Sequence, residues 1–179
     1  MSGALAVPVS DADHAKGSVD APVTLVEYGD YQCPACGMAY PFVQEILQRS
    51  GEQLRFVFRN FPLSQAHPYA SMAAQVAEGA ASLGRFWEMH DWLYENQDHW
   101  TQRGAEGIAD GVQAVGLDPM QLQEALEDNH IAERVRHDFM GGVRSGVNGT
   151  PSFYLNGQLY AGGFDTLGQA VGQMIAQAR

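Results

Sequence analysis

Cys33 and Cys36 are the only cysteines among the 179 residues of this chain. They stand in the run Tyr31-Gln32-Cys33-Pro34-Ala35-Cys36-Gly37. Two thiols separated by two residues can form a disulfide and exchange it with another dithiol. No other cysteine is left for a structural bridge, so any thiol chemistry of the chain takes place at this pair.

The sequence around the pair supplies a strand and a helix. Residues 23–28 are β-branched and mostly apolar, which predicts a short buried strand. Apolar residues then recur at helical spacing over residues 39–47, and Ser50-Gly51 provides an end for that helix. Cys33 therefore comes at the helix start. Pro34 takes the first helical position, where its missing N–H is tolerated.

This placement predicts different roles for the two sulfurs. Unpaired N–H groups and the dipole at a helix N-terminus stabilise an anion. We therefore expect the pKa of Cys33 to fall from about 8.5 into the range of about 3.5–7.5. Cys36 follows one helical turn later on the same face. Cys33 is predicted to be the exposed nucleophile and Cys36 the resolving thiol.

A zinc site is the alternative interpretation of two cysteines at this spacing. Zinc needs two more ligands, and the six histidines (positions 14, 67, 90, 99, 130 and 137) show no close ligand spacing. Pro34 also suits a helix start better than a zinc loop. We expect no metal ligands, and a site completed by two distant histidines stays open as the alternative.

Composition limits the classes of partner. Hydrophobic residues make up 45% of the chain, which is enough for a core, and the formal net charge is −11. Such an acidic chain is a poor ligand for nucleic acid or for an anionic membrane surface. No run approaches the roughly 18–20 apolar residues of a membrane span.

The first eight residues lack the basic region and the long apolar stretch of a signal peptide. Two compartments stay open. The protein is cytoplasmic as written, or it is periplasmic or otherwise extracytoplasmic if a leader has been removed. The difference bears on function because disulfide-forming enzymes work in oxidising compartments.

The order of elements predicts an α/β protein. A second strand is expected at residues 54–60, helices at 68–145, a hairpin around Asn156-Gly157, and a closing helix after it. A strand–helix–strand unit followed by a hairpin gives a mixed central sheet flanked by helices, here with an inserted all-helical subdomain. The predicted ranges are an extended arm at 1–20, an α/β domain at 21–65 and 146–179, and the helical subdomain at 66–145.

A proline just before the predicted hairpin is a second candidate for the site. Gly149-Thr150-Pro151-Ser152 leads into the strand, and a proline there would remove a ladder hydrogen bond. A cis Thr150–Pro151 bond would let this loop approach the sulfurs without offering an N–H. Spacing alone favours an ordinary trans turn, because cis is the minority state of X–Pro bonds.

Together these features resemble the thioredoxin superfamily, and within it the DsbA-like thiol–disulfide oxidoreductases. The resemblance extends from Asp20 to the last helix. Cys33-Pro34-Ala35-Cys36 is similar to the family's active-site motif, residues 147–153 to its cis-proline loop, and residues 84–90 to part of its helical insertion. It implies the thioredoxin fold and a protein disulfide oxidoreductase. The Cys33–Cys36 disulfide would serve in place of a cofactor.

The resemblance also implies roles for residues outside the motif. It makes the Thr150–Pro151 bond cis and pairs the Thr150 backbone with an extended substrate segment. Glu27, six residues before Cys33, matches a buried acid that exchanges a proton with Cys36. The alternative for Glu27 is a strand residue that faces solvent.

The implied partners are cysteine-containing protein substrates and an unidentified redox partner that recycles the pair. We expect the oxidising direction, although Ala35 stands where the best-known members have a thiolate-stabilising histidine. Thr150 also replaces their valine. A redox-inactive or zinc-binding thioredoxin-like module remains the alternative function. Tyr31, Met38 and Phe61 are candidates for an apolar groove, and core packing is the alternative for them.

Overall fold

The computed structural model describes residues 3–178, so Met1 and Ser2 of the predicted arm and Arg179 lie outside the described residues. Backbone contacts divide the chain into two compact units. The first consists of Met1–Gly29, Met38–Arg59 and Met140–Arg179, and the second of Asp30–Gly37 and Asn60–Phe139. These bounds differ from the predicted domain ranges, most of all because the short segment with both cysteines belongs to the helical unit.

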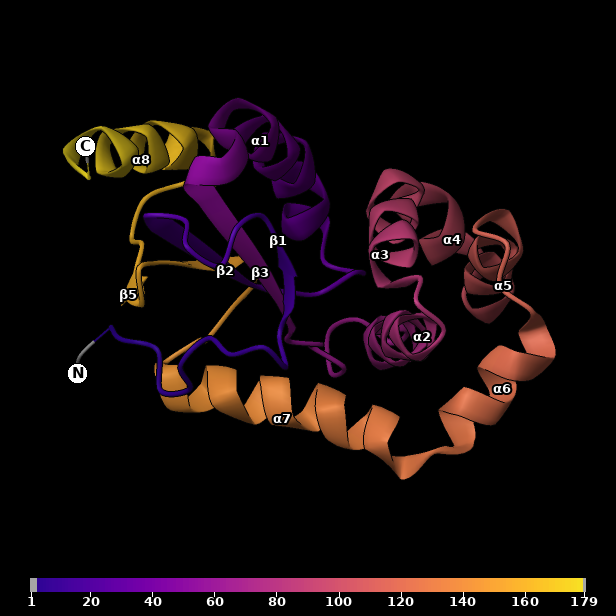
Figure 1. Cartoon of the computed structure of the whole chain (residues 1–179). Helices are drawn as coiled ribbons and strands as arrows, with labels where there is room; N and C mark the ends of the chain where they lie inside the picture. Colours follow the sequence, from indigo (N-terminus) through magenta and orange to yellow (C-terminus); the bar gives the residue numbers. More distant parts are fainter. Residues whose placement is uncertain (1–2, 179) are drawn as a thin grey trace. The chain divides into compact units, whose positions relative to one another are not determined.

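A mixed five-stranded sheet forms the centre of the first unit, as predicted (Figure 1). Its spatial order is β1 (His14–Lys16), β3 (Leu54–Asn60), β2 (Val23–Gly29), β4 (Ser152–Leu155) and β5 (Gln158–Leu159). In β2 and β3 all residues are buried except the second of each strand. Both strands have neighbours on either side, which explains why they read as nearly continuous apolar runs.

Two helices of the first unit pack on each other beside this sheet. They are α1 (Pro34–Ser50), from Met38 onward, and α8 (Phe164–Gln177). The rings of Phe42 and Phe164 lie 5.3 Å apart, and Gly168 lies against Ile46. A short 3-10 helix, η1 (Gly51–Gln53), follows α1 at the predicted stop signal and leads into β3.

The predicted N-terminal arm contributes a strand to the sheet. His14–Lys16 pairs antiparallel with β3, opposite residues 56–58. The buried guanidinium of Arg59 donates to both carboxylate oxygens of Asp13, at 2.9 and 3.0 Å, and to the Val7 and Pro8 carbonyls. The arm is therefore held by backbone pairing with β3, by a bridge between Ala4 and Gln158 of β5, and by a buried ion pair.

The predicted hairpin is confirmed. β4 and β5 pair antiparallel across the two-residue turn Asn156-Gly157, with Leu155 opposite Gln158. The φ angles of the turn residues are 47° and 80°. Positive φ at both positions is the type I′ geometry that Asn-Gly favours, because its twist matches that of the strands.

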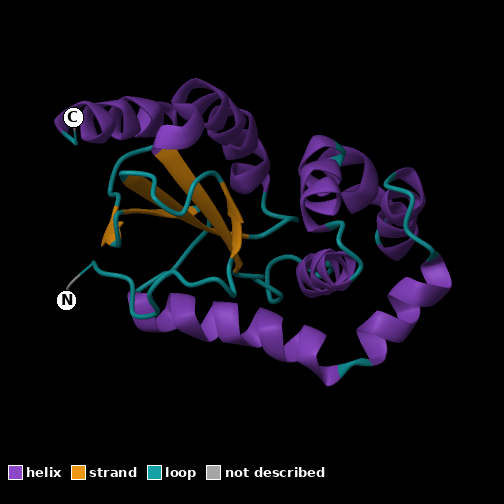
Figure 2. Ribbon diagram, in the orientation of Figure 1, coloured by secondary structure: helices purple, strands orange, loops and turns teal. Residues whose placement is uncertain are grey.

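The second unit is built from helices and loops, without strands of its own apart from Asn60 at the end of β3 (Figure 2). Its helices are α2 (Ala70–Ser82), α3 (Phe86–Glu95), α4 (Gln97–Arg103), α5 (Ala105–Ala114), α6 (Pro119–Glu127) and the first part of α7 (Asn129–Ser145). Helix α6 has a side-chain cap, since the Asp118 carboxylate accepts from the N–H groups of Met120 and Gln121 and Pro119 begins the helix. Helix α4 lies within the range 68–145 for which helices were predicted, and Trp100 is its only buried residue.

Candidate active site

The cysteine pair lies where α1 begins, as predicted. Pro34 is the first residue of the helix, and the Cys33 carbonyl accepts the first helical hydrogen bond, from Gly37 N–H at 3.1 Å. Cys33 therefore takes the capping position, and Cys36 follows within the first turn. Pro34 is exposed and Ala35 half-buried, so the two residues between the cysteines form the accessible part of the motif.

The accessibility of Cys33 differs from the prediction of an exposed nucleophile. Only 6% of its surface is exposed, and Cys36 has no exposed surface. The order of the two sulfurs is as expected, since Cys33 is the more accessible. The turn that carries Cys33 is covered because Gln97, at the start of α4, donates from Nε2 to the carbonyls of Tyr31 and Cys33 at 2.8 and 2.9 Å.

Asp30 is a site residue that the sequence did not predict. Its carboxylate is buried and accepts hydrogen bonds from the backbone N–H groups of Gln32, at 2.8 Å, and Leu63, at 2.9 Å. The ring of His67 completes the set, with Nδ1 2.7 Å from Oδ2 of Asp30. Acidic residues are abundant in the chain, so nothing local distinguished this one.

Gly37 provides the room that Gln97 needs. A Cβ at position 37 would overlap the side-chain amide of Gln97. The glycine directly after Cys36 thus lets α4 approach the first turn of α1 and hold the carbonyls of the cysteine loop.

The three candidates for an apolar groove, Tyr31, Met38 and Phe61, differ in burial. Tyr31 is buried, with its hydroxyl 3.0 Å from Nδ1 of His90, and Phe61 is buried and stacks on Phe139 with ring centroids 4.4 Å apart. Core packing is therefore the correct interpretation for both. Met38 is 58% exposed and is the only one of the three on the surface.

Glu27 is buried in the middle of the sheet. It lies in β2 opposite Phe153 of β4, and only 3% of its surface is exposed. The alternative of a solvent-facing strand residue is therefore wrong. A carboxyl group is kept away from water at this point, as the resemblance implied.

The proline loop lies beside Glu27 in the first unit. The Thr150–Pro151 peptide bond is cis, and the next residue, Ser152, pairs with Tyr28. Strand pairing thus brings Glu27 and the cis proline to the same end of β2 and β4. Cys33 and Cys36 belong to the second unit, so a meeting of this loop with the sulfurs stays a prediction.

Among residues 3–178 no three His, Cys, Asp or Glu side chains are grouped as ligands for a metal. Over the same residues, no helix combines the length and the apolar character needed to cross a membrane.

A sequence model of a family described as thioredoxin matches residues 10–172. This chain belongs to the thioredoxin family. Its fold is that of the DsbA-like members of the superfamily. A thioredoxin-like oxidoreductase from Silicibacter pomeroyi DSS-3 is 26% identical, with a TM-score of 0.80 over 95% of each chain. BdbD from Bacillus subtilis is 25% identical, with a TM-score of 0.78 over 98% of this chain and 97% of that one.

The curated relatives of this thioredoxin-family chain are longer proteins. One from Salinispora arenicola (strain CNS-205), named Na(+)/H(+) antiporter NhaA 1, is 42% identical over 178 residues. The match covers 98% of this chain and 27% of that protein. The chain thus spans about a quarter of the length of the curated relatives that it matches.

Proposed function

We propose that this thioredoxin-family protein exchanges disulfides with cysteine-containing protein substrates through Cys33 and Cys36. The observation that carries the proposal is the position of Cys33 at the N-terminus of α1, with Cys36 within the same turn. A thiolate is stabilised there, and a stabilised thiolate is both a nucleophile and a good leaving group. The oxidoreductase fold supports thiol–disulfide exchange in general.

The exchange runs in two balanced steps. A substrate thiolate attacks Sγ of Cys33 in the Cys33–Cys36 disulfide, which forms a mixed disulfide and releases Cys36 as a thiolate. A second thiolate of the substrate then attacks the substrate sulfur and releases Cys33. The substrate loses two electrons and becomes a disulfide, and the protein becomes a dithiol. In the reverse direction Cys33 attacks a substrate disulfide and Cys36 resolves the intermediate.

Two residues of the first unit are assigned supporting roles in this proposal. The buried carboxyl of Glu27 gives or takes the proton at Cys36 when that sulfur leaves or attacks. The backbone at Thr150, before the cis proline, pairs with an extended substrate segment. Both roles require the loop and the acid to face the cysteines, and trapped substrate complexes would test this.

We propose the oxidising direction. The helix N-terminus and the Asp30 N–H, 3.5 Å from Sγ of Cys36, both favour the negative charge that the reduced cysteine pair carries. Ala35 lacks the additional stabilisation of a histidine, so we expect a moderate oxidant. Equilibration with glutathione measures this. A reduction potential near −120 mV marks an oxidant, and a potential near −270 mV marks a reductant and would contradict the proposed direction.

Paired serine variants test the exchange itself. Cys33→Ser should abolish oxidation of a dithiol peptide, because the attacked sulfur is gone, and should leave the circular dichroism spectrum unchanged. Cys36→Ser should instead accumulate a mixed disulfide at Cys33, detectable by mass spectrometry. Wild-type activity that survives in Cys33→Ser would rule out the mechanism.

The curated relatives favour one candidate partner. These relatives are named Na(+)/H(+) antiporters, and the region that matches this chain makes up about a quarter of their length. We therefore propose a membrane antiporter as a partner. A pull-down from cells that express Cys36→Ser, followed by reduction and mass spectrometry, would show whether an antiporter is disulfide-linked to Cys33. A different captured protein would identify another substrate or the unidentified partner that recycles the pair.

A redox-inactive or zinc-binding module is the competing function. It requires that the cysteines bind metal or do nothing while the protein surface binds a partner. Metal analysis of the reduced protein, together with the dithiol oxidation assay, separates these possibilities. Stoichiometric zinc without exchange activity would favour the module over the enzyme.

A further inference from the structure

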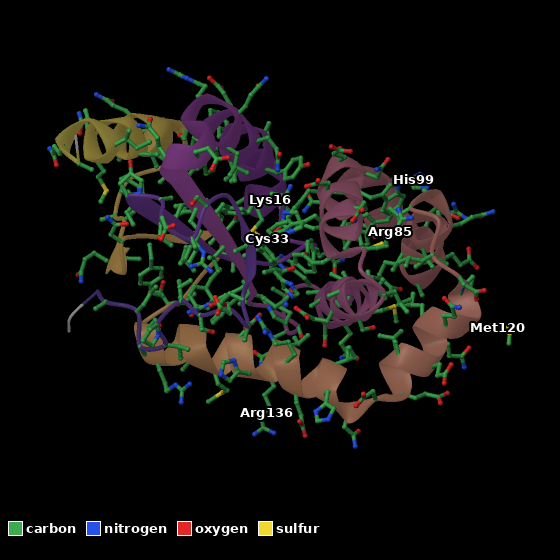
Figure 3. The ribbon with its side chains drawn as sticks, in the orientation of Figure 1. Lys16, Cys33, Arg85, His99, Met120 and Arg136 are labelled. Atoms are coloured by element: carbon green, nitrogen blue, oxygen red, sulfur yellow. The ribbon has the colours of Figure 1, made fainter. Side chains whose placement is uncertain are left out.

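Asp30 links both cysteines through its main chain. Its carbonyl accepts from Cys33 N–H at 3.1 Å, and its N–H donates to Sγ of Cys36 at 3.5 Å. A movement of this one residue therefore changes the backbone of the first cysteine and the hydrogen bonding of the second. Cys33, the first of the two cysteines, is labelled in Figure 3.

The side chain of Asp30 is held by three donors. Oδ1 accepts from Gln32 N–H, and Oδ2 accepts from Leu63 N–H and lies 2.7 Å from Nδ1 of His67. Because each oxygen of the Asp30 carboxyl group already accepts from a backbone N–H, we assign the imidazole nitrogen as the donor in this contact. The Asp30 side chain has no exposed surface, so an unmade hydrogen bond there cannot be replaced by bulk water.

His67 is the only one of these donors that is a side chain, and it reaches the surface. Its side chain is 19% exposed. It lines a cavity of about 280 Å³ together with Gln32, Pro34, Gln97, Asp98 and Thr101. The cavity thus joins the histidine to the exposed proline between the cysteines.

We propose that His67 is a positioning residue for the cysteine pair, an inference that rests on the proposed thiol–disulfide exchange. His67 fixes the Asp30 carboxylate, and the fixed Asp30 holds its N–H toward Sγ of Cys36 and its carbonyl toward Cys33. His67 touches neither sulfur. It therefore acts on the redox equilibrium and not as a group that transfers the proton or the electron pair.

The direction of the effect follows from hydrogen-bond strength. The reduced pair carries one thiolate charge, which the two neighbouring sulfurs share through the remaining thiol proton. A sulfur with part of this charge accepts an N–H bond more strongly than a disulfide sulfur does, because charge-assisted bonds are the stronger ones. Loosening Asp30 weakens this bond and destabilises the reduced protein more than the oxidised protein. Loss of the His67 donor should therefore shift the pair toward the disulfide and make the protein a weaker oxidant.

Three variants at position 67 test the inference. Each is equilibrated with fixed ratios of reduced and oxidised glutathione, and the ratio of dithiol to disulfide protein is measured. His67→Ala and His67→Leu lack the donor, and leucine keeps much of the ring's volume. For both, the ratio of dithiol to disulfide protein should fall at least about threefold, the effect of one hydrogen bond. His67→Asn places an amide N–H near the position of Nδ1 and should restore the ratio. His130→Ala, which removes a surface histidine with an 85% exposed side chain, is the matched control.

A ratio unchanged in both donor-less variants would overturn the inference, and so would an asparagine variant that behaves like alanine. Unfolding of both donor-less variants, with asparagine folded, would show a purely structural role and would also overturn it. The measurement needs no protein substrate. A wild-type protein that fails to oxidise dithiol peptides would therefore refute the proposed function while the glutathione equilibrium still decides the role of His67.

Discussion

Gly37, the residue after the second cysteine, is a position where one methyl group should have a measurable effect. In Gly37→Ala the new Cβ displaces the Gln97 amide and breaks its hydrogen bonds to the Tyr31 and Cys33 carbonyls. Two lost bonds cost about 2 kcal/mol, and the better helix propensity of alanine returns about 1 kcal/mol. We expect a net loss of about 1 kcal/mol in urea unfolding.

The Gln97→Ala background is the control for this prediction. Without the amide, Gly37→Ala removes nothing and only improves the helix, so the same change should stabilise the protein by about 1 kcal/mol. A destabilising effect of equal size in both backgrounds would show that Gln97 is not the group displaced.

Tyr154 gives a prediction about alkaline pH. Burial, and then the nearby Tyr28, raise the pKa of Tyr154 above its usual value, and its hydroxyl donates to the Ser145 carbonyl at 2.9 Å. Below the unfolded pKa of about 10 this contribution to stability is fully present. Above that pH the unfolded chain releases the proton first, so the free energy of unfolding should fall as the pH rises.

Tyr154→Phe removes this hydrogen bond, so its free energy of unfolding at neutral pH should be about 1 kcal/mol lower than that of the wild type. Its stability should also decline less steeply above about pH 10 than that of the wild type. Urea unfolding at a series of pH values up to 11 measures both effects. An alkaline slope identical to that of the wild type would assign the decline to other groups.

The residues of the site were predictable where their chemistry is rare. Two cysteines at this spacing indicate a redox motif directly, and Pro151 comes just before a hairpin that the sequence predicts. Asp30, His67 and Gln97 were missed because they are common polar residues whose partners lie 33 to 66 positions away in the chain. Their importance comes from the tertiary contacts that bury them, and the local sequence carries no sign of those contacts.

At the scale of single elements, the cap of α6 is the clearest test. Asp118 accepts from the N–H groups of Met120 and Gln121, at 2.8 and 3.3 Å, in front of Pro119. Asp118→Ala should lower the free energy of unfolding by about 1 kcal/mol, because two donors of the first turn lose their partner. Glu124→Ala, an exposed change within the same helix, should stay within about 0.5 kcal/mol of the wild type. Equal effects of the two changes would contradict the capping role.

Elements were predictable in proportion to the strength of their local pattern. The β4–β5 hairpin and the start of α1 follow from turn and cap residues that leave few alternatives. Strand β1 and the bounds of helix α4 were not predicted. Each element is short, with one buried residue, Trp100, in α4 and none in β1, so its local pattern is weak and partners elsewhere in the chain decide its conformation.

At the scale of the whole molecule, the loss of Arg59 should strongly destabilise the first unit. Burial alone would lower the pKa of Arg59, but hydrogen bonds with Asp13 and Tyr28 outweigh it and hold the pKa above its usual value. Arg59→Met leaves Asp13 buried without its guanidinium and should cost about 3–5 kcal/mol.

Thermal unfolding measures this loss, and Arg55→Met, four positions earlier on the same strand and only half-buried, is the matched control. The double variant Arg59→Met, Asp13→Ala should recover part of the stability, because no uncompensated charge remains. A double variant that loses the sum of both single effects would contradict the ion-pair explanation.

The two outer strands of the sheet have a consequence for behaviour in concentrated solution. They are three and two residues long, and the three-residue strand ends in Lys16, the only lysine of the chain (labelled in Figure 3). The three-residue edge is short and ends in a charge, and the outer side of β5 is already bridged by Ala4, which pairs with Gln158. A second molecule therefore finds almost no unpaired backbone to which it could add a strand. With eleven negative charges in excess, such molecules also repel one another. Fibril formation and edge-to-edge aggregation should therefore be slow for this protein even at high concentration.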